Sequence, residues 1–142
     1  MDIREVPLED IWSIRQSVMY PDETVEFVKL EDDETGIHLG LYVEEQLVSV
    51  ISLFEKPDEI QFRKFATVTA RQGRGYGTHL LQYVMDWAAA RKKRTIWCNA
   101  RMSATGIYKK FGMQETGSSW KKYDIDFIKM TKKISDADHT GH

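Results

Sequence analysis

The chain has 142 residues, the size of one ordinary domain, with 42% hydrophobic residues, 30% charged residues and a net charge of -2. This balance gives no reason to expect a nucleic-acid partner, and no apolar run approaches the roughly 20 residues that cross a bilayer. The lone Cys98 excludes an internal disulfide framework and, together with an N-terminus that lacks the apolar core of a signal peptide, favours a cytoplasmic protein.

The first third of the chain predicts a helix, an acidic loop and a hairpin. Leu8–Tyr20 places apolar residues at helical spacing, and Pro21 ends the helix. Residues 22–34 carry seven acids against one base, Lys29, which favours a solvated loop or a short broken helix. The two strands of the predicted hairpin, joined by residues 44–46, are Ile37–Val43 and Leu47–Phe54.

The middle of the chain predicts a strand, a glycine-rich turn and a long helix. Pro57 and Asp58 mark a turn, and Gln61–Thr69 follows as a strand. After the glycine-rich run 71–77, a helix extends from about Gly75 to Arg91. Its apolar stripe is the clearest in the chain and consists of Leu80, Leu81, Val84, Met85, Trp87 and Ala88.

The last part alternates strands with one short helix. Ser103–Phe111 is the helix, and Gly112 closes it as a left-handed cap. Residues 135–142 are expected to be a disordered tail, so residues 1–134 form the single predicted domain, of mixed α+β class. The predicted strands are Arg94–Ala100, Met113–Gly117 and Trp120–Met130.

The turn Gln72–Thr78 is the strongest candidate for a ligand site. Its glycines at 73, 75 and 77 permit positive φ and remove side chains that would keep a ligand from the main chain. Because the turn opens a helix, its N–H groups and the helix dipole favour an anion such as a pyrophosphate. The alternative is a loop that only connects strand to helix. Two basic side chains stand beside the turn, Arg71 and Arg74.

Two common phosphate-binding patterns do not fit this turn. A P-loop needs Gly-x-x-x-x-Gly-Lys-Ser/Thr, which the sequence lacks. The dinucleotide fingerprint needs Gly-x-Gly-x-x-Gly near the start of a domain, whereas here the third glycine comes one residue early and the turn lies mid-chain.

A third pattern fits closely. Gln72-x-x-Gly75-x-Gly77 matches the Gln/Arg-x-x-Gly-x-Gly/Ala signature, Phe65–Val68 resembles the strand before it, and Ile107–Met113 resembles a later Leu-Tyr-x-Lys-x-Gly-Phe segment. In this order, these segments resemble the GNAT acetyltransferase superfamily. The resemblance covers roughly residues 3–131, with its specific motifs within 65–113.

The resemblance implies a fold and a donor. The fold is one mostly antiparallel sheet of six to seven strands flanked by helices, with a splay between the fourth and fifth strands. The co-substrate is acetyl-CoA, whose pyrophosphate would bind the turn amides and whose pantetheine would pair with the fourth strand. The implied cofactor-binding residues are Phe65, Ala66, Thr67, Gln72, Gly73, Arg74, Gly75, Tyr76, Gly77, Thr78, Arg101 and Tyr108.

The resemblance also implies a catalytic residue. Tyr108 matches the tyrosine near the thioester sulfur, where a hydroxyl can protonate the leaving thiolate. The predicted reaction moves an acetyl group to a primary amine, on a small molecule or a protein, by direct attack in a ternary complex. The alternative for Tyr108 is an ordinary packing residue before a helix cap.

Arg101 departs from the family pattern. Many members have an asparagine at this position, and here Asn99-Ala100-Arg101 resembles a variant subgroup. Arg101 is expected to reach a phosphate, to reach an acidic group of the substrate, or to be solvated.

No general base is assigned from the sequence. The candidate bases are His38, expected to be structural, and the loop acids Glu55, Asp58 and Glu59, expected to be solvated. His79, inside the long helix, is expected to be half-buried, and His139 and His142 are too far apart to propose a metal site.

Several features bear on the acceptor and on alternatives to catalysis. The first helix and acidic run 22–34 often frame the acceptor in this superfamily, so the run could attract a cationic amine. The last hairpin is expected to line the acceptor cleft, while three tryptophans are expected in the core. A CoA-binding module without catalysis, an interaction domain without a cofactor and a homodimer through edge strands stay open. The hairpin residues are Trp120, Lys122 and Tyr123, and the core tryptophans are Trp12, Trp87 and Trp97.

Overall fold

The computed structural model describes residues 1–134, which divide into two compact units. Strand β4 (Glu59–Thr67) and helix α3 (Tyr76–Ala90) each begin in one unit and end in the other. The predicted tail, 135–142, lies outside the described residues. The first unit consists of Met1–Phe54 and Phe62–Leu81, and the second of Glu55–Gln61 and the described residues from Gln82 onward.

Three antiparallel strands form the sheet part of the first unit. The predicted hairpin is confirmed, and its turn residues Glu44 and Glu45 adopt φ of 51° and 65°. The sequence did not predict β1, a short and mostly exposed strand that pairs with β2. The three strands are β1 (Asp2–Glu5), β2 (Ile37–Val43) and β3 (Gln46–Glu55).

The helices of the first unit pack on this sheet through a small apolar cluster. Helix α1 (Leu8–Met19) has its C-cap at Tyr20, in agreement with the predicted stop before Pro21. The acidic run contains only a one-turn helix, α2 (Val25–Val28), and the 3₁₀ helix η1 (Asp33–Thr35), so the predicted broken helix is confirmed. The buried members of the cluster are Val6, Ile11, Ile14 and Val50.

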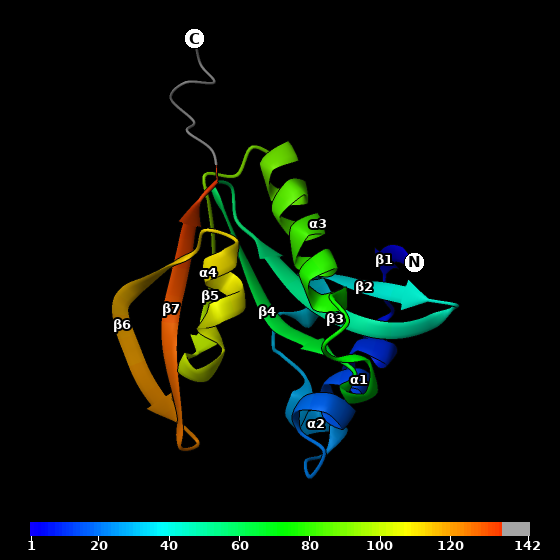
Figure 1. The fold of residues 1–142 in the computed structure, drawn as a ribbon. Coiled ribbons are helices and arrows are strands. Elements are labelled where there is room, and N and C mark those ends of the chain that lie inside the picture. Colours follow the sequence, from blue (N-terminus) through cyan, green and yellow to red (C-terminus); the bar gives the residue numbers. More distant parts are fainter. Residues whose placement is uncertain (135–142) are drawn as a thin grey trace. The chain divides into compact units, whose positions relative to one another are not determined.

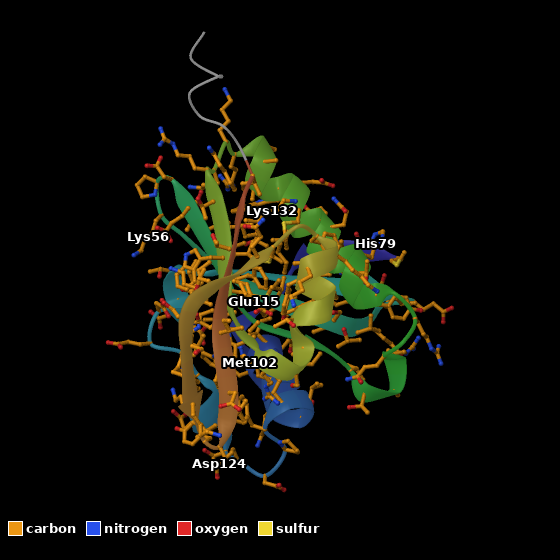
Figure 2. All side chains as sticks on the ribbon, turned by 60° about the vertical axis from the view of Figure 1, so that its left-hand side comes forward. Lys56, His79, Met102, Glu115, Asp124 and Lys132 are labelled. Carbon is orange, nitrogen blue, oxygen red and sulfur yellow. The ribbon has the colours of Figure 1, made fainter. Side chains whose placement is uncertain are left out.

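The second unit contains a three-stranded sheet and a short helix. The predicted strand Trp120–Met130 is wrong, because Tyr123 and Asp124 adopt φ of 53° and 60° and turn the chain into a hairpin (Figure 2). Gly112 has φ of 85°, so the predicted left-handed cap is confirmed. The elements are β5 (Thr95–Arg101), η3 (Met102–Ala104), α4 (Thr105–Lys110), β6 (Gln114–Lys122) and β7 (Ile125–Lys133).

The strands form one mixed sheet in the order β1-β2-β3-β4-β5-β7-β6 (Figure 1). The β4–β5 ladder is parallel, whereas the ladders of β1–β2, β2–β3, β5–β7 and β6–β7 are antiparallel. None of the helices in residues 1–134 is long and apolar enough to cross a membrane. The predicted α+β class and sheet of six to seven strands are therefore confirmed.

Candidate active site

The glycine-rich turn between β4 and α3 presents a row of free backbone N–H groups. Among residues 1–134, no acceptor takes a hydrogen bond from the N–H groups of residues 73–78, and the first bond of the helix runs from His79 N to Gly75 O at 3.0 Å. Gly73 and Gly75 have φ of 78° and 84°, and a Cβ added to either would meet no atom within 4 Å. The turn therefore has the open space and the unpaired donors that an anion needs.

Side chains hold this turn against the end of β4. Gln72 Nε2 donates to the Thr67 carbonyl at 3.0 Å. A Cβ on Gly77 would lie 3.2 Å from both the Phe65 ring and Thr67 Oγ1, so glycine here allows α3 to start close to the strand. Gln72 thus braces the turn through its side chain, while the turn amides stay free.

The two arginines beside the turn differ in their contacts. Arg71 donates to Gln46 Oε1 at 2.7 Å, so its guanidinium is tied to the start of β3. The side chain of Arg74 is exposed and has no hydrogen-bond or ion-pair partner among the residues that the structure describes. Of the two, Arg74 is the one with a free guanidinium for a ligand.

Strand β4 changes direction in its middle. Lys64 adopts φ of 54°, the left-handed geometry that occurs at β-bulges, and its Nζ donates to the Tyr20 hydroxyl at 2.9 Å. The parallel ladder joins Glu59–Gln61 to Thr95–Trp97 and ends before this residue, although both strands continue. The predicted splay between the fourth and fifth strands is therefore present, and the sequence could not show the bulge because lysine carries no signal for a positive φ.

Tyr108 lies on α4 in the second unit, close to Cys98 of β5. Burial, with a smaller contribution from Cys98, raises the pKa of the Tyr108 hydroxyl well above its ordinary value of 10. Burial likewise raises the pKa of the Cys98 thiol to about 12. Both groups therefore stay protonated at neutral pH.

Strand β5 directs alternate side chains to opposite faces of the sheet. Cys98 and Ala100 are buried on one face, whereas Asn99 and Arg101 are exposed on the other. Tyr108 lies near Cys98, whose side chain is on the face of β5 opposite to that of Arg101. The side chain of Arg101 has no hydrogen-bond or ion-pair partner within residues 1–134.

A comparison with known families identifies the chain. The profile described as "Acetyltransferase (GNAT) domain" matches residues 13–134. The chain belongs to the GNAT acetyltransferase family. It is an N-acetyltransferase, as the sequence predicted.

Relatives of this GNAT enzyme agree with the assignment. An uncharacterised N-acetyltransferase of Bacillus subtilis, YitI, is 26% identical over 137 residues, covering 90% of each chain. The ribosomal-protein-S18-alanine N-acetyltransferase of Escherichia coli has a similar fold, with a TM-score of 0.80, 19% identity and coverage of 95% of this chain and 94% of that one. A GNAT acetyltransferase of Elizabethkingia anophelis, solved with acetyl-CoA bound, gives a TM-score of 0.71, 16% identity and coverage of 93% and 97%.

The sequence-predicted cofactor residues fall into two groups in this GNAT fold. The predicted residues of the first unit lie together around the glycine-rich turn. In the second unit, Arg101 and Tyr108 lie on opposite sides of β5. The open space at Gly73 and Gly75 and the free turn amides fit the pyrophosphate of acetyl-CoA. The first group contains Phe65, Ala66, Thr67, Gln72, Gly73, Arg74, Gly75, Tyr76, Gly77 and Thr78, and the second contains Arg101 and Tyr108.

Two of the acids considered as general bases are already engaged. Glu55 forms an ion pair with Lys93 at 2.9 Å, and the hydrogen bond from Lys93 holds the pKa of Glu55 below its ordinary value. Glu59 accepts a hydrogen bond from Trp97 Nε1. Asp58 is exposed, in agreement with the expectation of a solvated acid. No general base is therefore assigned.

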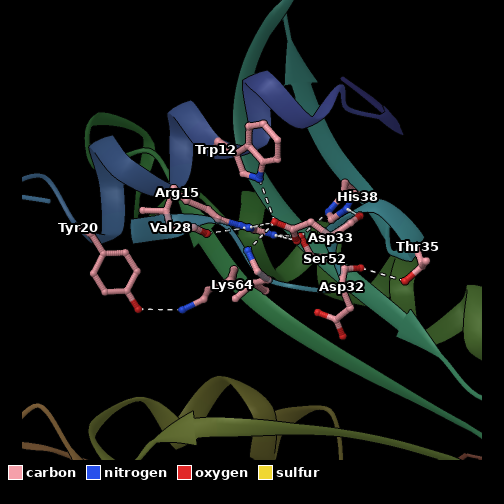
Figure 3. Close-up of polar contacts among 11 residues, drawn as sticks. Trp12, Arg15, Tyr20, Val28, Asp32, Asp33, Thr35, His38, Ser52 and Lys64 are labelled. Atoms are coloured by element: carbon pink, nitrogen blue, oxygen red, sulfur yellow. Dashed lines mark hydrogen bonds and ion pairs between the residues drawn. The ribbon is translucent and has the colours of Figure 1, made fainter. Parts of the chain in front are cut away.

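A buried polar network in the first unit was not predicted (Figure 3). Arg15 is fully buried and binds both carboxylate oxygens of Asp33, at 2.8 and 3.0 Å. Its guanidinium also donates to Ser52 Oγ, which contacts His38 Nδ1 at 2.8 Å. The expectation of a solvated acidic run is wrong for Asp33, and the only signal in the sequence was an arginine on the apolar face of the first helix.

The remaining expectations concern histidines, tryptophans and metals. His38 is buried and hydrogen-bonded, which agrees with the structural role expected for it, whereas His79 is exposed rather than half-buried. The three tryptophans expected in the core are only partly buried: Trp12 and Trp97 each use the indole N–H to bind a carboxylate. Within residues 1–134, no group of His, Cys, Asp or Glu side chains could hold a metal ion.

Proposed function

We propose that this GNAT enzyme transfers the acetyl group of acetyl-CoA to a primary amine by direct attack in a ternary complex. The observation that carries the proposal is the row of free N–H groups at 73–78, which suits the donor's pyrophosphate. The splay of β4 from β5 supports it, because unpaired strand edges can hydrogen-bond an extended ligand. The free, buried Cys98 accords with a reducing compartment, which we propose to be the cytoplasm.

The proposed chemistry needs one proton donor from the chain. The neutral amine nitrogen attacks the thioester carbonyl carbon, so a C–N bond forms and the C–S bond breaks. The Tyr108 hydroxyl gives its proton to the leaving thiolate, and the proton that the amine nitrogen loses passes through solvent and restores the hydroxyl. The raised pKa of Tyr108 supports this role, since the hydroxyl is protonated at the start of each turnover.

Deprotonation of the amine is left to solvent in this proposal. A lysine-like amine has a pKa of about 10.4, so only about one molecule in a thousand is neutral near pH 7.4. The value of kcat/KM is then expected to rise about tenfold per pH unit up to the acceptor's pKa. Because the pKa of Tyr108 is raised, no loss of activity from phenolate formation is expected over this range.

The experiment is a thiol-release assay with acetyl-CoA and a panel of primary amines, run from pH 6.5 to 9.5. Amine-dependent release with the expected pH slope supports the proposal. Binding of CoA without release for any amine would indicate a CoA-binding module instead. Absence of CoA binding would contradict both.

A further inference from the structure

Arg101, Phe127 and Trp120 form a row across three strands of the second unit. Arg101 lies directly opposite Phe127 in the β5–β7 ladder, and Phe127 lies directly opposite Trp120 in the β6–β7 ladder. Directly opposite residues have their Cβ atoms about 4.5–5.5 Å apart and point to the same face. The three side chains are therefore neighbours on one face of the sheet.

The two aromatic residues of this row form an open apolar platform. The rings of Trp120 and Phe127 stack, with centroids 5.9 Å apart and an interplanar angle of 15°. Trp120 is 39% exposed, so part of its indole surface faces water. An apolar group placed against the platform would remove this surface from water, which is favourable.

The cation at the end of the row is free. Arg101 has no partner among the described residues, and a guanidinium binds a carboxylate through two parallel hydrogen bonds. On the same face, Glu59 of β4 lies opposite Thr95 of β5 and already accepts a hydrogen bond from Trp97. Trp97 is four residues from Arg101, about 13 Å along β5.

The charge of the surrounding unit favours the same kind of ligand. The described part of the second unit contains thirteen Lys and Arg against seven Asp and Glu. The two acids of β6 and β7, Glu115 and Asp126, are paired with Lys109 and Lys121. A carboxylate at Arg101 would therefore meet an attractive field with no acid of these strands left unpaired.

We propose that the row of Arg101, Phe127 and Trp120 is the acceptor subsite and that its acceptor is an apolar α-amino acid. Arg101 binds the carboxylate, and the aromatic platform holds the apolar side chain. The proposal rests on the acetyl transfer proposed above and names its substrate class. It also assigns Arg101 to the acceptor rather than to CoA, because Arg101 shares its face of the sheet with the aromatic platform.

The reaction on this acceptor is balanced without a further reagent. The neutral α-amine attacks the thioester carbon, the C–N bond forms and the C–S bond breaks. The products are the N-acetyl amino acid and CoA thiol, with one proton released from the ammonium form of the amino acid. The carboxylate on Arg101 takes no part in bond making, so Arg101 is a binding residue.

The test compares three acceptors that share one aromatic group: L-phenylalanine, L-phenylalaninamide and phenethylamine. Values of kcat/KM are expressed per concentration of neutral amine, because the three amines titrate at different pH. The expected preference for phenylalanine over the other two is at least tenfold. Arg101→Gln is expected to abolish this preference while leaving the Kd for CoA within twofold of the wild-type value.

Two further variants separate the subsite from general effects. Trp120→Ala is expected to lower kcat/KM about tenfold for phenylalanine and to leave it unchanged for glycine. Lys133→Gln is the matched control, because it removes a positive charge from the same face about 20 Å from Phe127 along β7, and it should keep the preference.

The outcomes distinguish this inference from the proposed function. Equal rates for the three acceptors, or an unchanged preference in Arg101→Gln, would overturn the subsite but leave acetyl transfer intact. A tenfold loss of CoA affinity in Arg101→Gln would assign the residue to the cofactor instead. If the enzyme binds acetyl-CoA but transfers the acetyl group to none of the amines, both proposals are overturned.

Discussion

The Tyr108 hydroxyl is held in its neutral form because burial disfavours the phenolate. In the proposed reaction, the neutral phenol donates its proton to the leaving CoA thiolate. Replacement by phenylalanine keeps the ring and removes only the hydroxyl. We expect Tyr108→Phe to lower kcat by about 10²–10⁴-fold, the usual contribution of a general acid, with an unchanged Kd for CoA.

The matched control for this variant is Tyr83→Phe. Tyr83 lies on α3 and is 41% exposed, so the loss of its hydroxyl should leave kcat and stability unchanged. Steady-state kinetics and calorimetric titration with CoA measure both quantities. A Tyr108→Phe enzyme with wild-type kcat would show that Tyr108 is a packing residue.

At the scale of elements, the turn between β4 and α3 depends on backbone geometry. Gly75 has φ of 84°, which costs an ordinary residue about 1–2 kcal/mol. We expect Gly75→Ala to lower the free energy of unfolding by about that amount and to weaken CoA binding about tenfold, because the turn amides move. Gly75→Asn should lose less, since asparagine tolerates a positive φ.

Gly75→Asn and Gly117→Ala are the two controls that isolate the effect of backbone strain at Gly75. A Cβ at Gly117 would also meet no atom within 4 Å, but its φ is not in the left-handed region, so Gly117→Ala should change stability by less than about 0.5 kcal/mol. Urea unfolding and CoA titration provide the values. Equal stability losses in Gly75→Ala and Gly75→Asn would contradict the argument from φ.

The network around Asp33 connects α1, η1, β2 and β3 within the first unit. Burial alone would raise the pKa of Asp33, but hydrogen bonds from Arg15, Leu30 N–H and Trp12 outweigh it and hold the pKa below its ordinary value. A carboxylate with a lowered pKa stabilises the folded state above the unfolded pKa of about 3.9. This stability is lost as the pH falls below about 4 and through the pKa of the folded state.

Asp33→Asn tests this network. The variant leaves Arg15 as an uncompensated buried charge, so we expect a loss of about 3–5 kcal/mol at pH 7 and a flatter decline of stability below pH 4. Asp32→Asn, at the exposed neighbouring position, should stay within about 0.5 kcal/mol of the wild type. The measurement is urea unfolding from pH 3 to 7.

A milder variant keeps the test informative if Asp33→Asn does not fold. Trp12→Phe removes one hydrogen-bond donor to Asp33, at 2.9 Å, and keeps an aromatic ring. We expect it to lose about 1.5–3 kcal/mol, the usual value for a hydrogen bond to a charged group. A loss as small as that of Asp32→Asn would show that the indole N–H does not stabilise the carboxylate.

At the scale of the whole molecule, a ligand that binds only the folded state stabilises it by mass action. CoA at 100 times its Kd should add about 2.7 kcal/mol, which for a chain of this length raises Tm by about 10 °C. Differential scanning fluorimetry with CoA measures the shift, and adenosine, which lacks the pyrophosphate, is the control. No shift with saturating CoA would contradict the assignment of the turn at 73–78.

The sequence by itself determined the family, the class of fold and the position of the glycine-rich turn. Local signals carry these features: glycine spacing at residues 73–77, the apolar stripe of α3 and the segment around Tyr108 depend on near neighbours in the chain. The predicted strand Trp120–Met130 is wrong because its turn contains one common turn residue, Asp124, and no glycine or proline marks it.

Only the tertiary structure decided which side chains are buried, paired or free. In the sequence, Asp33 is one more acid of a run that is expected to be solvated. In the structure, Arg15, which is 18 residues away in the chain, binds its carboxylate. From the sequence alone, Arg101 is interpreted as a phosphate ligand, a ligand of an acidic substrate group or a solvated charge. In the structure, the strand ladders place Arg101 opposite Phe127, and Phe127 opposite Trp120. The burial of Asp33 and the register of Arg101 both depend on residues that are distant in sequence. Burial and pairing set the pKa of the Asp33 carboxylate, and strand register sets which side chains the Arg101 guanidinium can reach.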